Sequence, residues 1–308
     1  MTTRPTLAIT GGTGFVGSHV LDQALAAGHS LRALTRKPQP DRAGVTWVIG
    51  TLETAGSLEH LCAGADAVIH SAGAVNVPTR AAFAAANIAG TSAIVDAATQ
   101  AGVTRFLHVS SLAAREPQLS NYGWSKAEAE RVVEGSGLDW AIIRPPAIYG
   151  PRDADILDVF RMARSGIMLL PPAGRTSLIH VADLARLLVA LAAGTQPLAH
   201  ALYEVADDTA GGLSHQAMAQ LIAQAVARPN AWRITAPAPL VRLAARGDRL
   251  VRGSRARLTP DRASYMCHAD WVADPAKAPP VHLWQPHIPA AEGLAATAQW
   301  YRENGWLK

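Results

Sequence analysis

The sequence predicts an α/β fold in which a doubly wound parallel sheet carries a smaller C-terminal substrate lobe. Strand-like and helix-like segments alternate strictly as far as Pro151, as in such a sheet, and a glycine-rich turn follows the first apolar run. The 308 residues, 49% hydrophobic and 17% charged, suffice for both parts and exclude a disordered or fibrous chain. We expect residues 1–150 to form the sheet domain and residues 151–308 the lobe, with 176–200 returning to the sheet.

The first strand and first helix are joined by Thr10–Gly17, which reads Thr-Gly-Gly-Thr-Gly-Phe-Val-Gly. Glycines at 11, 14 and 17 allow a tight turn, close approach of the backbone to a pyrophosphate, and close packing of the helix on the strand. The free N–H groups of the helix N-terminus also attract phosphate. We therefore predict a dinucleotide site here, although a glycine-rich turn alone can simply join a strand to a helix.

The remaining strands and helices are predicted from the spacing of apolar residues along the sequence. Short apolar runs bounded by turn residues predict strands, and apolar residues three and four apart predict helices. The expected further strands are Leu31–Thr35, Val45–Ile49, Ala67–His70, Arg105–Val109, Trp140–Arg144 and Ser177–Val181. The expected further helices span about 58–62, 79–101, 122–135, 156–165, 183–193, 214–227, 239–251 and 290–303. Between them, Ile167–Pro172 is apolar enough to wall a substrate pocket.

Two strand ends bear on the cofactor. The second strand ends at Arg36-Lys37, and a basic residue there suits the 2′-phosphate of NADP, with NAD as the alternative. The other interpretation of these two residues is surface charge before a proline-rich turn. After the fourth strand, the small residues Ser71-Ala72-Gly73 would let a cofactor pass closely, while His70 fits a buried strand histidine better than a catalyst.

Tyr122 and Lys126 are the candidate chemical pair. They are four residues apart at the start of a helix, so both lie on one face. A tyrosine normally titrates near pH 10, and an adjacent ammonium stabilises its phenolate, which makes it a general acid and base. Ser110 or Ser111, at the end of the fifth strand, would orient the same carbonyl or hydroxyl. The same spacing also occurs on ordinary surface helices, but the position after the fifth strand favours chemistry.

The charge and cysteine content constrain partners and compartment. The formal charge is +4, and the basic surplus is spaced among Leu240, Leu243, Leu250 and Val251, which predicts the solvated face of an amphipathic helix rather than a nucleic-acid site. The arginines concerned are Arg242, Arg246, Arg249, Arg252, Arg255 and Arg257. Two distant cysteines predict neither a disulfide nor a metal site. Without a signal peptide or an apolar run of about 18 residues, we expect a cytoplasmic protein with no membrane partner.

Taken in order, these motifs resemble the short-chain dehydrogenase/reductase superfamily in its extended or atypical branch, the NAD(P)-dependent epimerase/dehydratase family, which has a Rossmann-type fold. The resemblance covers almost the whole chain. Its motifs are Thr10–Gly17 (TGxxGxxG), His70–Gly73 (HxAG), Asn87–Thr91 (NxxGT), Tyr122–Lys126 (YxxxK), Arg144–Pro151 (RPxxxYGP), Ile179–Leu184 and Ala298–Trp306.

The resemblance implies roles for individual residues. Tyr122 would be the acid and base, Lys126 would also bind the nicotinamide ribose, and Ser111 would polarise the substrate, with Ser110 beside the cofactor. Residues beyond Pro151 would surround the substrate. The expected cofactor contacts are Gly11, Thr13, Gly14, Phe15, Val16, Arg36, Leu52, Ala72, Gly73, Ser110, Tyr122, Lys126, Pro145, Pro146 and Ile148.

Three functions are consistent with these features. The first is an NADP-dependent oxidoreductase acting on a small, largely apolar carbonyl or alcohol. The second is a sugar-nucleotide epimerase or dehydratase that retains NAD, and the third is a catalytically silent NADP-binding assembly or sensor protein. The apolar stretch Ile167–Pro172 and the ten residues between Ser111 and Tyr122, shorter than in extended members, favour the first over the second. We expect a small-molecule substrate and allow for a homodimer.

Overall fold

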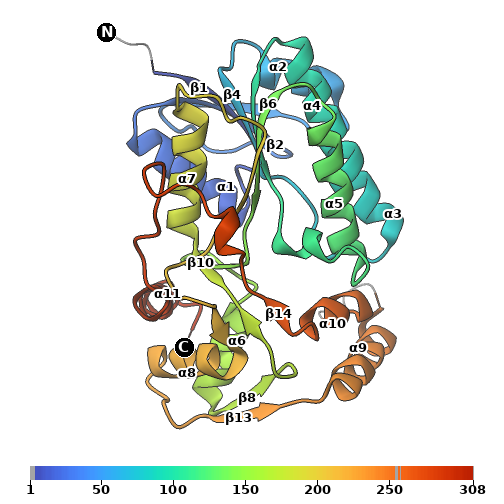
Figure 1. Ribbon diagram of the computed structural model, residues 1–308, viewed down its shortest axis with the longest axis vertical. Helices are drawn as coiled ribbons and strands as arrows, with labels where there is room; N and C mark the ends of the chain where they lie inside the picture. The colour runs from blue at the N-terminus through green and yellow to red at the C-terminus, as the bar shows by residue number, and fades with distance from the viewer. Residues whose placement is uncertain (1–3, 254–255, 257, 308) are drawn as a thin grey trace. The chain divides into compact units, whose positions relative to one another are not determined.

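The computed structural model describes residues 4–253, 256 and 258–307, and the chain divides into two compact units (Figure 1). The first unit comprises the described residues of Met1–Arg144 together with Leu184–Glu204 and Pro279–Gln285. The second comprises Pro145–Asp183, Val205–Ala278 and the described residues of Pro286–Lys308.

A seven-stranded, all-parallel sheet in the order β11-β6-β5-β4-β1-β2-β3 forms the centre of the first unit. Its central strands are apolar runs because helices cover both faces, α1 and α7 on one side and α2, α4 and α5 on the other (Figure 1). The Rossmann-type parallel sheet predicted from the sequence is therefore confirmed. The strands are β1 (Thr6–Thr10), β2 (Ser30–Thr35), β3 (Val45–Ile49), β4 (Ala67–His70), β5 (Arg105–Val109), β6 (Asp139–Arg144) and β11 (Ala201–Glu204). The helices are α1 (Phe15–Ala26), α2 (Ala55–Cys62), α3 (Arg80–Phe83), α4 (Gly90–Gln100), α5 (Asn121–Glu134) and α7 (Val181–Ala193), with a 3-10 turn η2 (Leu112–Arg115).

The long helix predicted over 79–101 contains a π-helical segment, η1 (Ala84–Ala89), between α3 and α4. Such segments are rare and commonly occur at functional sites. By length and mean hydropathy, 1.3 over its most apolar window, Arg80–Gln100 is the one described helical stretch that could cross a membrane. Core helices of globular proteins meet the same criterion, and this one packs against α2 and α5.

The second unit is built from short strands and helices around Phe160 and Tyr301, whose rings pack edge to face. Its strands are β7 (Ala147–Tyr149) paired with β10 (Leu178–His180), β8 (Ile167–Leu170) paired with β13 (Trp232–Thr235), and β9 (Arg175–Thr176) between β12 (Leu213–Ser214) and β14 (Asp270–Trp271). Its helices are α6 (Leu157–Ser165), α8 (His215–Ala225), α9 (Ala238–Arg252), α10 (Pro260–Met266), η4 (Pro275–Lys277) and α11 (Ala290–Glu303).

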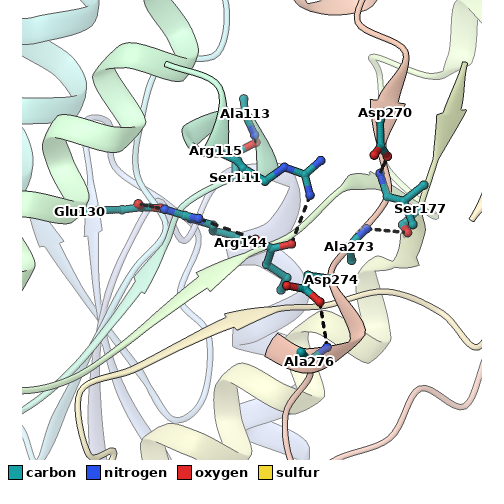
Figure 2. A network of polar contacts seen from close by, with 12 residues as sticks. Ser111, Ala113, Arg115, Glu130, Arg144, Ser177, Asp270, Ala273, Asp274 and Ala276 are labelled. Carbon is teal, nitrogen blue, oxygen red and sulfur yellow. Dashed lines mark hydrogen bonds and ion pairs between the residues drawn. The ribbon is translucent and has the colours of Figure 1, made fainter. Parts of the chain in front are cut away.

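Side-chain caps fix the segment after β14. Ser177 Oγ accepts from Ala273 N at 3.0 Å, and Asp274 Oδ1 accepts from Ala276 N at 3.0 Å to begin η4 (Figure 2). These bonds give side-chain acceptors to the N–H groups of Ala273 and Ala276, which lie beyond the end of β14.

Two elements differ from the sequence expectation for the return to the sheet. Within the expected range 176–200, strand β10 pairs with β7 in the second unit, whereas the strand that joins the sheet is β11, just beyond that range. The reason is that two short apolar strands flank α7, and sequence pattern alone does not say which of them completes the sheet.

Helix α9 exposes its leucines as well as its arginines. Its buried residues are Val241 and Ala245, while Leu240, Leu243 and Leu250 are exposed. The four described arginines of the helix are exposed, as predicted; Arg255 and Arg257 lie outside the described residues. Two apolar stripes run along this helix, and the smaller side chains form the packed one.

Candidate active site

The turn after β1 is shaped by close backbone contacts. Gly11 has φ +75°, and a Cβ on it would lie 2.7 Å from Ala72 N. A Cβ on Gly17 would lie 2.1 Å from the carbonyl oxygen of Gly11, so only glycine lets α1 begin this close to the strand. Among the described residues no side chain caps the first amides of α1, and Thr13 and Gly14 are exposed. These amides therefore fit the pyrophosphate of a dinucleotide.

The sheet order places this turn where an α/β sheet binds ligands. From β1 the chain proceeds to β2 and β3 on one side and to β4, β5 and β6 on the other, so β1 and β4 flank the topological switch point. Ser71 Oγ donates to Thr10 O at 2.8 Å, and Ala72 N donates to Thr10 Oγ1 at 3.3 Å. Thus hydrogen bonds join the ends of the two strands, and the predicted contact Ala72 lies beside Gly11, with Gly73 next in the chain.

His70, at the end of β4, is buried in the core, as predicted. Its ring nitrogens lie 2.7 Å from Thr10 Oγ1 and 2.9 Å from Thr91 Oγ1. Burial lowers its pKa to about 3, and the charge of Lys126 acts in the same direction, so the ring is neutral at physiological pH. The ring stacks on His108, whose pKa burial also lowers well below its usual value.

Asn87, in the π-helical segment, connects the end of β4 to α5. Its amide exchanges hydrogen bonds with the backbone of Ala74, at 2.7 and 3.0 Å, and donates to Ser125 Oγ at 2.8 Å. Ser125 Oγ in turn donates to the carbonyl oxygen of Tyr122 at 2.8 Å. Asn87, the first residue of the NxxGT motif, is thus placed to position the first turn of α5 through the backbone.

The start of α5 holds Tyr122 and Lys126 one turn apart. Ser120 Oγ accepts from Gly123 N at 2.9 Å and caps the helix. A Cβ on Gly123 would lie 2.5 Å from Ala113 O, so a glycine is needed for α5 to pack on η2. The Tyr122 ring is half-buried, with its centroid 6.2 Å from that of Phe83.

Lys126 is buried and anchored to the end of β5. Its Nζ donates to the carbonyl oxygen of Val109 at 2.7 Å. Burial lowers its pKa from 10.5 to about 8, against the opposing effect of the Glu130 carboxylate. The structure therefore brings the lysine to the strand end at which Ser110 and Ser111 follow.

The two candidate serines have different environments. Ser110 is buried, and its Oγ donates to Glu130 Oε1. Ser111 is half-buried, and its Oγ accepts from Ala113 N at 3.1 Å, which leaves its own proton for donation (Figure 2). The geometry thus favours Ser111 over Ser110 as the serine that contacts a substrate.

A buried ion network behind Ser110 was not predicted from the sequence. Arg144 pairs with Glu130 through two bonds of 2.8 and 2.6 Å, and lies 3.7 Å from Glu204; Arg115 lies 3.5 Å from the same Glu204 (Figure 2). Two acids and two bases balance the buried charges. In the sequence, the feature that relates to this network is the four-residue spacing of Lys126 and Glu130, which places both side chains on one face of α5.

The other predicted contacts are divided between the units. Arg36 is exposed at the end of β2, next to β1, and so lies at the same edge of the sheet as the turn. Leu52 is half-buried against the core, and a Cβ on Gly90 would lie 2.7 Å from its Cδ1. Phe15 and Val16 begin α1. Pro145, Pro146 and Ile148 belong to the second unit, and their contact with the cofactor stays a prediction.

Comparison with known proteins agrees with this geometry. A family model described as NAD(P)H-binding matches residues 11–194. The ceramide reductase of Caulobacter vibrioides is 35% identical over 99% of this chain and 96% of its own. A 4-hydroxy-2-methyl-3-oxo-4-farnesyl-3,4-dihydroquinoline-1-oxide ketoreductase of Stigmatella aurantiaca is 32% identical over 51% of this chain and 55% of its own. Among solved structures, the Bordetella bronchiseptica enzyme WbmH in complex with NAD+ superimposes with a TM-score of 0.75 at 21% identity, covering 98% and 99% of the two chains.

Proposed function

Because this chain belongs to the NAD(P)H-binding proteins of the extended short-chain dehydrogenase/reductase superfamily, we propose that it is an NADP-dependent oxidoreductase interconverting a largely apolar ketone and its alcohol. The observation that carries the proposal is the anchoring of Lys126 to Val109 O, which joins the Tyr122–Lys126 face of α5 to the strand end that bears Ser111. The proton donor Tyr122 and the ammonium of Lys126 thus come from α5, and the orienting hydroxyl of Ser111 follows β5, at the edge of the sheet where ligands bind.

In this mechanism the chain's residues handle the proton and the orientation. When bound, NADPH supplies the hydride for the substrate carbon. The Ser111 hydroxyl donates a hydrogen bond to the carbonyl oxygen, and the Tyr122 hydroxyl gives that oxygen its proton. The ammonium of Lys126 stabilises the phenolate that remains until solvent reprotonates it.

The names of two relatives support an apolar substrate. One is a reductase of ceramide and the other a ketoreductase of a farnesyl-bearing compound, and both molecules carry large hydrocarbon parts. Solved structures of sugar-nucleotide enzymes such as the UDP-N-acetylglucosamine 4-epimerase of Bacillus cereus and the dTDP-glucose 4,6-dehydratase of Streptomyces venezuelae, 18% and 23% identical to this chain, support only the fold. The choice of NADP rests on the exposed guanidinium of Arg36 at the end of β2.

The test is a pair of matched substitutions assayed on long-chain alkyl ketones. Tyr122→Phe should lower kcat by about 100-fold or more and leave the Kd for NADPH unchanged, because it removes the proton donor alone. Tyr203→Phe, in β11, removes a hydroxyl elsewhere in the sheet and should change neither value. Equal losses of turnover and NADPH binding in Tyr122→Phe would instead assign the tyrosine a structural role.

Two further results would contradict the proposal. NAD that co-purifies with the protein and is not exchanged for added NADPH would indicate an epimerase or dehydratase that recycles its cofactor. Tight NADPH binding without turnover on any ketone or alcohol of a broad panel would indicate a silent binding protein.

A further inference from the structure

The second unit exposes apolar side chains on the paired strands β8 and β13 and on α9, the helix that follows β13 in the chain (Figure 1 locates the three elements). Eight of the eleven large hydrophobic side chains that are exposed among the described residues belong to these elements. Leu250 and Val251 are 87% and 85% exposed, and Trp232 is 72% exposed. Exposed apolar side chains concentrated on so few elements make these elements candidates for an interaction site.

The register of the β8–β13 pair builds one apolar face. Ile167 lies opposite Trp232, and Leu169 lies opposite Ile234, and all four are exposed. The alternate residues of β8, Met168 and Leu170, are buried in the core. Only half of the apolar stretch that was expected to wall a pocket therefore packs inside, and the other half faces outward.

Helix α9 adds a second apolar stripe. At about 100° per residue, Leu240, Leu243, Leu250 and Val251 fall on one side of the helix. The packed stripe, Val241 and Ala245, is separate from it and contacts α10. The exposed leucines are thus not needed for the fold of the unit.

The charges on α9 are complementary to an anionic surface. Arg242, Arg246, Arg249 and Arg252 are exposed, and the helix has a single acid, Asp248, which pairs with Arg252 at 3.2 Å. At about 100° per residue Arg246 flanks the leucine stripe and the other three arginines lie on the opposite side of the helix, so a two-fold dimer through the stripe would bring the Arg246 side chains of the two copies toward each other. A nucleic acid would satisfy the arginines but would leave the leucines in water.

We propose that the outward face of β8–β13 and the leucine stripe of α9 form a docking surface for an anionic phospholipid bilayer. The leucines and Trp232 enter the interface, the stem of Arg246 extends from the flank of the stripe to the headgroup phosphates, and the other arginines add positive charge on the polar side of the helix. This reverses the expectation from the sequence that the protein has no membrane partner. It does not rest on the proposed reduction, since docking needs neither cofactor nor substrate.

The test is flotation of the full chain with vesicles of equal parts phosphatidylglycerol and phosphatidylcholine, compared with pure phosphatidylcholine. We expect binding to the mixed vesicles that weakens as salt rises from about 0.05 to about 0.5 M. Leu250→Glu should lower the partition coefficient about tenfold or more, and Arg246→Gln about fivefold. The matched control is Val281→Glu, which adds the same charge at a 70% exposed residue of the first unit and should leave binding unchanged.

The variants replace exposed side chains, so equal urea midpoints will verify that they fold. The proposal is overturned if the chain does not float with the mixed vesicles, or if Leu250→Glu binds as wild type does. It is also overturned if Val281→Glu loses as much binding as Leu250→Glu. A dimer in sedimentation velocity that Leu250→Glu dissociates would assign the face to a second copy instead.

Discussion

Replacing Lys126 by Met should abolish turnover and make the stability of the protein respond differently to pH. The Lys126 ammonium is buried, and its pKa falls from 10.5 to about 8 because burial disfavours the charge. Lowering a pKa by one corresponds to about 1.4 kcal/mol, so holding the charged form in the fold costs about 3 kcal/mol at pH 7. Methionine removes this cost but leaves the carbonyl oxygen of Val109 without its donor, which costs about 1 to 3 kcal/mol.

The pH dependence separates these two effects. Because the pKa of Lys126 is lower in the folded chain than in the unfolded one, the unfolded chain binds more protons between pH 8 and pH 10.5. Stability of the wild type should therefore rise, relative to Lys126→Met, by about 2 kcal/mol from pH 7 to pH 10. The lost hydrogen bond to Val109 contributes equally at both pH values and cancels.

The assay is urea unfolding of both proteins at the two pH values, with NADPH affinity and turnover measured alongside. If the unfolding free energies of wild type and Lys126→Met differed by the same amount at pH 7 and at pH 10, the pKa of Lys126 would not be lowered in the folded chain, and the reasoning would be refuted. An active Lys126→Met variant would refute its role beside Tyr122.

Three further substitutions test other parts of the molecule. Gly17→Ala should abolish NADPH binding and cost at least about 2 kcal/mol, because its Cβ would lie 2.1 Å from a backbone oxygen, whereas Gly56→Ala, with nothing within 4 Å, should be tolerated in thermal unfolding. Arg36→Glu should weaken NADPH binding about tenfold or more in titration calorimetry and leave NADH binding unchanged. Glu130→Gln should cost about 3 kcal/mol in urea unfolding. Glu128→Gln, which breaks an exposed ion pair on the same helix, should cost less than about 0.5 kcal/mol; equal losses would contradict the buried network.

The features that the sequence predicts well are local. The strand, glycine turn and helix around Thr10–Gly17 follow from residue spacing, and the structure adds the contacts that make Gly11 and Gly17 necessary. Helix Ala290–Glu303 begins and ends where its period predicts. The spacing of Tyr122 and Lys126 likewise places both on one helical turn, because 3.6 residues complete a turn.

The features that the sequence does not predict depend on tertiary contacts. Glu130, Arg144 and Glu204 are distant in the chain, and only the adjacency of β6 and β11 brings the last two together. The π-helical segment that carries Asn87 has no signal in hydrophobic period, since its residues are mostly alanine.

Helix α9 illustrates a further limit of periodicity. A helix with two apolar stripes has the same period whichever stripe is buried, so the pattern could not decide between the leucines and the pair Val241 and Ala245. Packing against α10 selected the smaller residues. The leucines were thereby left as the exposed surface from which membrane docking is inferred.

The most direct test of the central claim is the fate of the hydride. The full chain, incubated with NADPH deuterated at C4 of the nicotinamide and a long-chain alkyl ketone, should yield an alcohol with one deuterium on the carbinol carbon, detected by mass spectrometry. Tyr122→Phe should yield almost none. The experiment is run with the deuterium on each of the two faces of the nicotinamide ring in turn. The assignment as an NADP-dependent oxidoreductase would be contradicted if the alcohol carried no deuterium with either label. It would also be contradicted if no ketone gave an alcohol although NADPH binds.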